Sequence, residues 1–121
     1  MTKLEYQIQN CDEFLKEWAN IKPKQVSSRL QNWEEHTACG TAACAGGWLP
    51  HMPWFQRLGV RRTCMGAPSI NDSDPTRVAK ELFGNSDMFS INHTNRPDHE
   101  VVTQRFENQK QVLIQQRESQ P

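Results

Sequence analysis

The sequence lacks three features that would each indicate a class of protein. It has no apolar run approaching the roughly 20 residues that span a bilayer, and its first residues lack the apolar core of a signal peptide. Lys and Arg total 14, as do Asp and Glu, so there is no excess charge of either sign. Proteins that bind nucleic acid normally carry a basic excess. We therefore expect a cytoplasmic protein that does not enter membranes, and direct nucleic-acid binding is disfavoured.

Cysteine and tyrosine are scarce as well, with four Cys and one Tyr in the chain. Because the cytosol keeps thiols reduced, we expect no disulfide framework. Hydrophobic residues make up 36% of the 121 residues, which suits one modest core in which five Phe and four Trp bury much of the area. We expect a single helical domain over 1–121, ordered from about 8 to 115, with a frayed C-terminal tail. Zero net charge also leaves a homo-oligomer open.

Apolar residues recur at helical spacing in the first half of the chain. Residues 10–21 predict a first helix, with Asn10 opening a capping box. Residues 24–35 predict a short helix or turn that packs Trp33 inward. Residues 41–49 are also predicted to be helical. Paired glycines there cost about 1 kcal/mol each relative to Ala, so such a helix would be stabilised by close packing of its small face.

Two later helices have clearer boundary signals. The sequence Asp-Ser-Asp-Pro at 72–75 is typical of a helix start with Pro at its first position, and Gly84 suits the residue after its end. Residues 97–117 predict a long terminal helix. The prediction rests on the helical spacing of Val102, Phe106, Gln109 and Leu113, with Val101, Val112 and Ile114 beside them.

Residues 50–71 interrupt the helical pattern with three prolines and two glycines. We expect an irregular loop there, with a helical turn around Trp54–Leu58 and a short β-hairpin after it. The predicted fold is therefore mainly α: a single compact domain of four to five helices with an irregular loop or short β-hairpin around 50–71.

Five potential metal ligands lie within 36–64: His36, Cys39, Cys44, His51 and Cys64. Zinc needs four such ligands, but the spacing lacks the paired knuckles of structural sites. A reactive thiol is a second interpretation, since Cys39 precedes a predicted helix start, where the helix dipole lowers a thiol pKa, and His36 or His51 could serve as its base. The third is that Cys44 is a small buried side chain, as free cysteines often are.

A recognition surface is predicted in the same Pro-rich segment. Trp and Arg are the residue types that dominate binding hot spots, and loops on a rigid scaffold often carry binding. The predicted partner-binding residues are Trp54, Phe55, Arg57, Arg61 and Arg62. The competing interpretation is that Trp48 and Phe55 belong to the core while the arginines only solubilise the surface.

The stretch from Trp33 to Gly47, W-x5-C-G-T-A-A-C-A-G-G, resembles a pattern found in small uncharacterised proteins of tailed phages and some bacteria. These proteins share a C-G-T-x-A-C core, a Pro and aromatic loop, a later A-x-x-L-F-G helix, present here at 79–84, and a terminal helix led by a Pro, as at Pro97. The resemblance covers roughly 26–115. It implies a phage or prophage accessory protein with a mostly helical fold, and it brings no catalytic residue.

These observations together favour a phage-derived, non-enzymatic binding protein that needs no cofactor. Its expected partner is a host protein or nucleoprotein complex, such as a defence nuclease, and an anti-CRISPR-type inhibitor is one instance. The alternative is a small metal- or thiol-dependent enzyme that uses the His36, Cys39, Cys44, His51 and Cys64 cluster. A homo-oligomeric structural protein is a third interpretation.

Overall fold

The computed structural model describes residues 2–21, 34–37, 40–43, 45–63, 67–90 and 94–119, and these are mainly helical. The helices in this part are α1 (Lys3–Trp18), α2 (Ala45–Trp48), the 3-10 helix η2 (Leu49–His51), α3 (Pro53–Arg57), α4 (Pro75–Phe83) and α5 (Asp98–Glu118). Two antiparallel pairs of short strands accompany them: β1 (Glu34–Thr37) with β2 (Gly40–Ala43), and β3 (Arg61–Arg62) with β4 (Pro68–Ser69). The prediction of a mainly α, single compact domain is confirmed.

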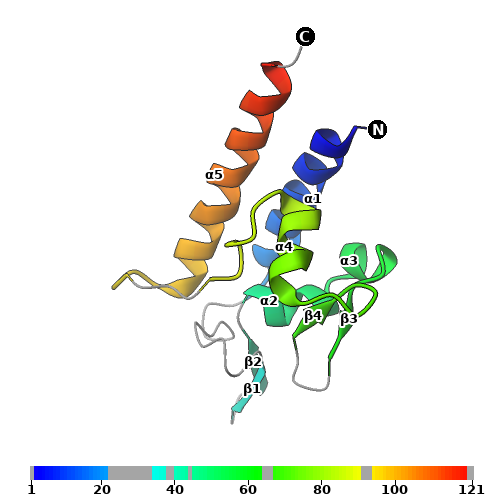
Figure 1. The fold of residues 1–121 in the computed structure, drawn as a ribbon. Coiled ribbons are helices and arrows are strands. Elements are labelled where there is room, and N and C mark those ends of the chain that lie inside the picture. The colour runs from blue at the N-terminus through cyan, green and yellow to red at the C-terminus, as the bar shows by residue number, and fades with distance from the viewer. Residues whose placement is uncertain are drawn as a thin grey trace.

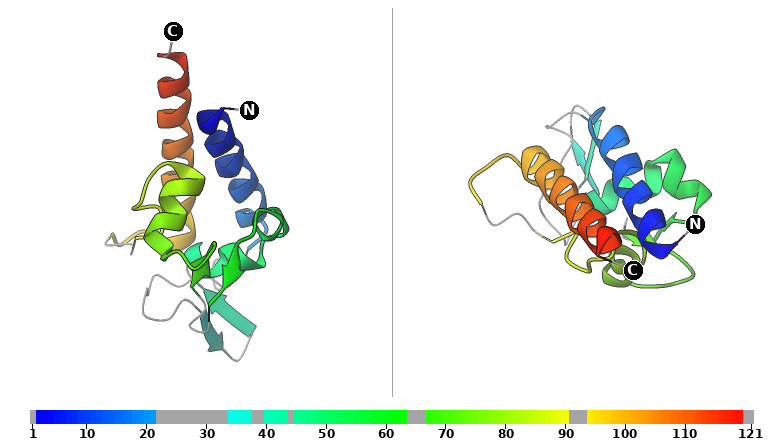
Figure 2. Two further views of the ribbon diagram at one scale, coloured as in Figure 1. Left: turned by 45° about the vertical axis from the view of Figure 1, so that its right-hand side comes forward. Right: turned by 90° about the horizontal axis from the view of Figure 1, so that it is seen from above.

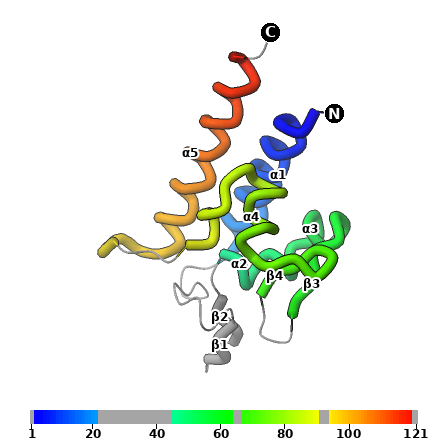
Figure 3. Tube along the Cα trace, viewed as in Figure 1, coloured from blue at the N-terminus to red at the C-terminus, as the bar shows by residue number. Residues whose placement is uncertain are grey.

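The long helices α1 and α5 lie side by side, with both chain termini at the same end of the pair (Figure 1, Figure 2). Helix α4 packs against α1. Helices α2 and α3 and the β3–β4 hairpin lie toward the end of this helix pair that is away from the chain termini, as the chain trace shows (Figure 3). This arrangement presents the Pro-rich segment on the outside of a helical scaffold.

An aromatic cluster fills the space between these helices. The Phe14 ring stacks on Phe106 with a centroid distance of 3.7 Å and on Trp18 at 5.3 Å. Phe83 meets Phe106 edge to face at 4.9 Å, and Phe55 lies 5.6 Å from Phe83. Such pairs stabilise by about 0.5–1.5 kcal/mol each beyond the area they bury. The four residues whose spacing predicted this helix are the buried residues of α5: Val102, Phe106, Gln109 and Leu113.

Reciprocal contacts join the end of α1 to the start of α5. The Trp18 indole N–H donates to the His99 carbonyl at 3.2 Å, and His99 Nε2 lies 2.9 Å from the Trp18 carbonyl oxygen. The two rings stack with centroids 5.1 Å apart. Polar groups at this buried junction are therefore satisfied across the two helices.

The start predicted for the first helix is wrong. The helix begins at Lys3, before the expected limit of ordered structure at residue 8, and the Thr2 hydroxyl caps it by accepting from the Glu5 N–H. Asn10 is fully buried in the middle of α1 instead of capping it. Its amide donates to the Leu82 carbonyl at 3.0 Å, and its oxygen accepts from the Trp54 indole at 2.9 Å. An Asn with tertiary partners for both groups need not compete with the helix backbone.

Two further expectations are corrected around the C-G-T-A-A-C stretch. Residues 34 and 35 belong to strand β1, not to the end of a helix or turn over 24–35, while 24–33, with Trp33, lie outside the described residues. The predicted 41–49 helix is shortened, because 40–43 form strand β2 and α2 begins only at Ala45. β-branched Thr37 and Thr41 favour strands, and Gly is a poor helix former. The small residues Ala45, Gly46 and Gly47 are buried, as close packing requires.

The other boundaries follow the sequence closely. Asp74 caps α4 by accepting from the Arg77 N–H at 2.9 Å, Pro75 is its first residue and Gly84 follows its end in the left-handed conformation. Helix α3 and the β3–β4 hairpin confirm the expectation for 50–71. Helix α5 continues to Glu118, into the tail that was expected to fray.

Candidate functional site

An open hollow forms where η2, α3 and β3 meet on the surface of the protein. Its volume is about 510 Å³. The residues that line it, which we call the arginine hollow, are Pro50, Pro53, Gln56, Arg57, Val60, Arg61 and Arg62. Three of the five predicted partner-binding residues therefore lie together, and no described lining residue is acidic.

The local backbone explains why these side chains converge. Met52 is extended, and Pro53 begins α3 with a backbone angle that is already suited to a helix. The helix ends after one turn, where Gly59 adopts a positive φ of 97° that L-residues rarely take. The Val60 N–H then returns to the Phe55 carbonyl at 3.0 Å. This tight reversal brings β3 back alongside α3.

Arg57 is positioned by an aromatic ring. Its guanidinium carbon lies 5.8 Å from the centroid of the Trp54 ring, within the range of a cation–π interaction. Trp54 is half-buried, and its indole N–H donates to the buried Asn10 oxygen at 2.9 Å. The ring is therefore fixed by the core on one side while it supports an exposed cation on the other.

Arg61 is positioned by backbone carbonyls. Its Nη1 donates to the carbonyl oxygens of Gln56 and Val60, each at 3.1 Å. Gln56 is itself fixed by donating to the Pro50 carbonyl at 2.9 Å. Neither Arg57 nor Arg61 pairs with a carboxylate in the described part of the chain. The two guanidinium groups therefore keep their charge available to another molecule.

The structure divides the other predicted binding residues between surface and core. Arg62 is exposed and lines the hollow. Phe55 is fully buried within the aromatic cluster, so the prediction that its side chain contacts a partner is wrong. Burial of its apolar ring against Phe14 and Phe83 stabilises the fold, whereas exposing the ring to water would forfeit that free energy. Sequence reasoning also missed Gln56 and Asn10, which act through contacts that no local pattern reveals.

The metal and thiol interpretations stay predictions. Cys39, Cys44 and Cys64 lie outside the described residues, and of His36 only the backbone, in β1, is described. His51 is exposed, with its ring edge-on to Trp48 at 5.8 Å. Within the described ranges, no three His, Cys, Asp or Glu residues gather closely enough to hold a metal ion.

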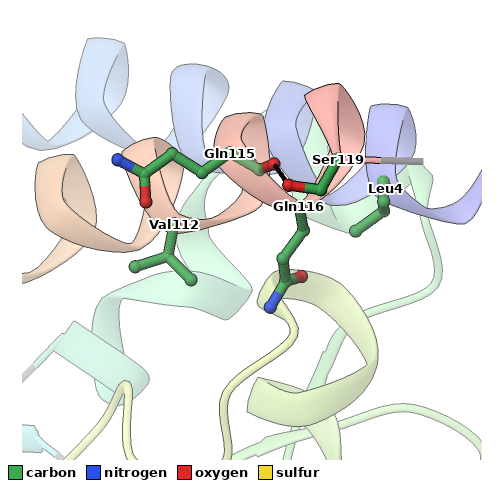
Figure 4. A pocket seen from close by; sticks show the side chains of 5 residues that line it. All are labelled: Leu4, Val112, Gln115, Gln116 and Ser119. Atoms are coloured by element: carbon green, nitrogen blue, oxygen red, sulfur yellow. Dashed lines mark hydrogen bonds between the residues drawn. The ribbon is translucent and has the colours of Figure 1, made fainter. Parts of the chain in front are cut away.

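Two other hollows differ in charge from the arginine hollow. One lies between the start of α1 and the end of α5 and is lined by Leu4, Val112, Gln115, Gln116 and Ser119 (Figure 4). None of its described lining residues is charged, and the Ser119 hydroxyl donates to the Gln115 carbonyl at 2.8 Å. The other, beside α4, contains both Arg77 and Glu81. Only the arginine hollow, of these three, concentrates charge of one sign.

None of the helices in the described ranges is both long and apolar enough to cross a membrane. No family model, no curated protein and no solved structure matches the chain.

Proposed function

We propose that the chain is a non-enzymatic binding protein that docks on a partner through the arginine hollow. The observation that best supports this is that Arg57 and Arg61 are exposed at one hollow and pair with no carboxylate among the described residues. Arginine forms directional, charge-assisted bonds across interfaces and is enriched in hot spots. The exposed Pro53 ring supplies apolar contact area in the same hollow.

We propose that this partner is a host factor in the bacterial cytoplasm and that the chain is of phage origin. The support for the origin is the resemblance of the Trp33–Gly47 stretch to proteins of tailed phages and bacteria. A host protein or nucleoprotein complex with a defence role is the partner class to examine first, and an anti-CRISPR-type inhibitor is the specific case.

A photo-crosslinking amino acid at Gln56 tests this proposal in bacterial cells. Gln56 is exposed and lines the hollow, whereas Gln111 is exposed on α5, so a crosslinker at Gln111 is the control. We expect one defined partner to be captured from position 56 and not from position 111. Mass spectrometry identifies it.

The double substitution Arg57→Ala with Arg61→Ala should reduce that capture at least tenfold, because two charge-assisted contacts are removed. Circular dichroism would show whether the variant remains folded. Equal capture from both positions, or capture that ignores the arginines, would refute the proposal. Capture of a partner with no defence role would contradict the anti-defence proposal and leave the proposal of a binding protein in place.

A further inference from the structure

We infer that the arginine hollow recognises an acidic peptide segment of a partner protein, with a carboxylate bound side-on by Arg61. This inference rests on the proposed function and specifies the chemistry of the partner. Four features of the hollow support it: the charge, the geometry of Arg61, the support of Arg57 and the exposed Pro53 ring.

Charge complementarity is the first step. The hollow holds Arg57, Arg61 and Arg62 with no acidic residue among the described lining. The whole chain has a formal net charge of zero, so this positive potential is local and would orient an acidic group at this place rather than attract polyanions to the entire surface.

Arg61 presents one defined edge of its guanidinium. Both Nη1 bonds go to the Gln56 and Val60 carbonyls, while Nε and Nη2 donate to no group in the described residues. A guanidinium binds a carboxylate bidentately either end-on through both Nη atoms or side-on through Nε and Nη2. Because Nη1 is already engaged, the side-on edge is the one left for a ligand.

Arg57 adds a second cation that is already ordered. Its guanidinium lies over the Trp54 ring, and Trp54 is linked through Asn10 to the Leu82 carbonyl in the core. Side chains that are ordered before binding lose less conformational entropy when a partner docks. Two fixed guanidinium groups with different supports suit two neighbouring carboxylates on one peptide.

The lining favours a peptide over a nucleic acid. The exposed Pro53 ring offers aliphatic surface in the same hollow as the cations, which matches side-chain methylenes. Single-stranded nucleic acid is held by aromatic faces on which bases stack. Trp54 is half-buried and Arg57 lies over its ring, so it is a poor stacking platform. The balanced net charge argues in the same direction.

The test is NMR titration of the isotope-labelled full chain with three probes. These are a short peptide of alternating Glu and Ala, the same peptide with Gln in place of Glu, and a single-stranded DNA oligonucleotide of equal length. We expect the Glu peptide to shift the Arg61 Nε–H and Trp54 indole N–H signals, and the Gln peptide to leave them unchanged.

Variants separate the bidentate geometry from charge alone. Arg61→Gln should lower the affinity for the Glu peptide about tenfold or more. Arg61→Lys, which keeps the charge but loses the planar edge, should lower the affinity nearly as much. Arg77→Gln, which removes an exposed arginine of α4, should leave the affinity unchanged.

The remaining outcomes each contradict a different part of the proposal. If only the DNA shifts the signals, the ligand is a nucleic acid and the inference is wrong. If no probe binds while Gln56 still crosslinks a partner in an arginine-dependent way, the proposed function stands and the acidic-peptide inference falls. Full affinity in Arg61→Lys would refute the side-on geometry.

Discussion

Individual buried side chains in this protein show how surroundings change the chemistry of a residue type. Cys11 is fully buried beside the Asp12–Lys110 ion pair. Burial, and then the negative charge of Asp12, raise the pKa of its thiol from 9.0 to about 12. A thiol held neutral in this way is a packing group rather than a nucleophile. The reactive-thiol interpretation therefore does not extend to this cysteine.

The raised pKa of Cys11 predicts a specific loss of stability in alkali. Between about pH 9 and about pH 12 the unfolded chain releases the thiol proton while the folded chain keeps it, so the free energy of unfolding falls as pH rises. One proton gives a slope of about 1.4 kcal/mol per pH unit. Below pH 9 the contribution is complete and independent of pH.

Urea unfolding of the wild type and of Cys11→Ala across this pH range measures the effect. The variant should be less stable at every pH, because the substitution leaves a small void in the core. Above pH 9, however, its free energy of unfolding should fall less steeply than that of the wild type. Subtracting the two curves cancels the titration of groups common to both proteins. Parallel curves for the two proteins would contradict the assigned pKa shift.

At the level of elements, α4 is held by amides from its two neighbours. The last carbonyls of a helix have no partner within the helix. Here Gln7 donates to Lys80 and Glu81, Asn10 to Leu82 and Gln109 to Phe83. Helices α1 and α5 thereby fix the end of α4 from both sides, and Gly84 turns the chain away in the left-handed conformation at φ 78°.

Gly84→Ala should destabilise the protein more than Gly59→Ala, although both glycines have positive φ. A Cβ at Gly84 would lie 3.0 Å from Gln7 Oε1 and 3.1 Å from a Leu113 methyl group, whereas a Cβ at Gly59 meets no atom of the described residues within 4 Å. We expect about 1–2 kcal/mol of backbone strain at each site, with a further ~1–2 kcal/mol from crowding at Gly84.

Thermal and urea unfolding of the two alanine variants provide the comparison. Gly59 is the matched control, because it also has a positive φ but lacks the packed surroundings among the described residues. Equal losses in the two variants would mean that the Gln7 amide and Leu113 relax freely. That result would contradict the prediction that close packing around Gly84 excludes a side chain there.

For the whole molecule, the sequence predicted what depends on neighbouring residues. The Asp74-Pro75 start, the Gly84 end and the apolar stripe of α5 are local signals, and the structure agrees with them. The prediction that Asn10 caps a helix is wrong, because the same sequence spacing fits both a capping box and an Asn buried within a helix. The arginine segment was identified, but the burial of Phe55 and the anchoring of Arg61 depend on contacts formed only in the fold.

Asn10 connects the scaffold to the arginine hollow, since it joins α1 to α3 through Trp54 and to α4 through Leu82. Asn10→Ala leaves the Leu82 carbonyl and the Trp54 indole N–H without these partners and opens a void. We expect a loss of about 2–4 kcal/mol in stability. Asn20→Ala is the control, because Asn20 is exposed and its amide donates, within the described residues, to the Lys16 carbonyl four residues earlier.

Asn10→Ala should also lower the affinity for the Glu peptide several-fold, because Trp54 would no longer hold Arg57 in place. This affinity is measured under conditions in which the variant is fully folded. Arg57→Gln should weaken peptide binding and lower stability by no more than about 1 kcal/mol, the value of an exposed cation–π contact, so the two variants separate support from direct contact. Urea unfolding and NMR titration supply both quantities. If Asn10→Ala lost stability but bound the peptide as the wild type does, the hollow would be independent of the core, and its order would have to come from α3 and β3 alone.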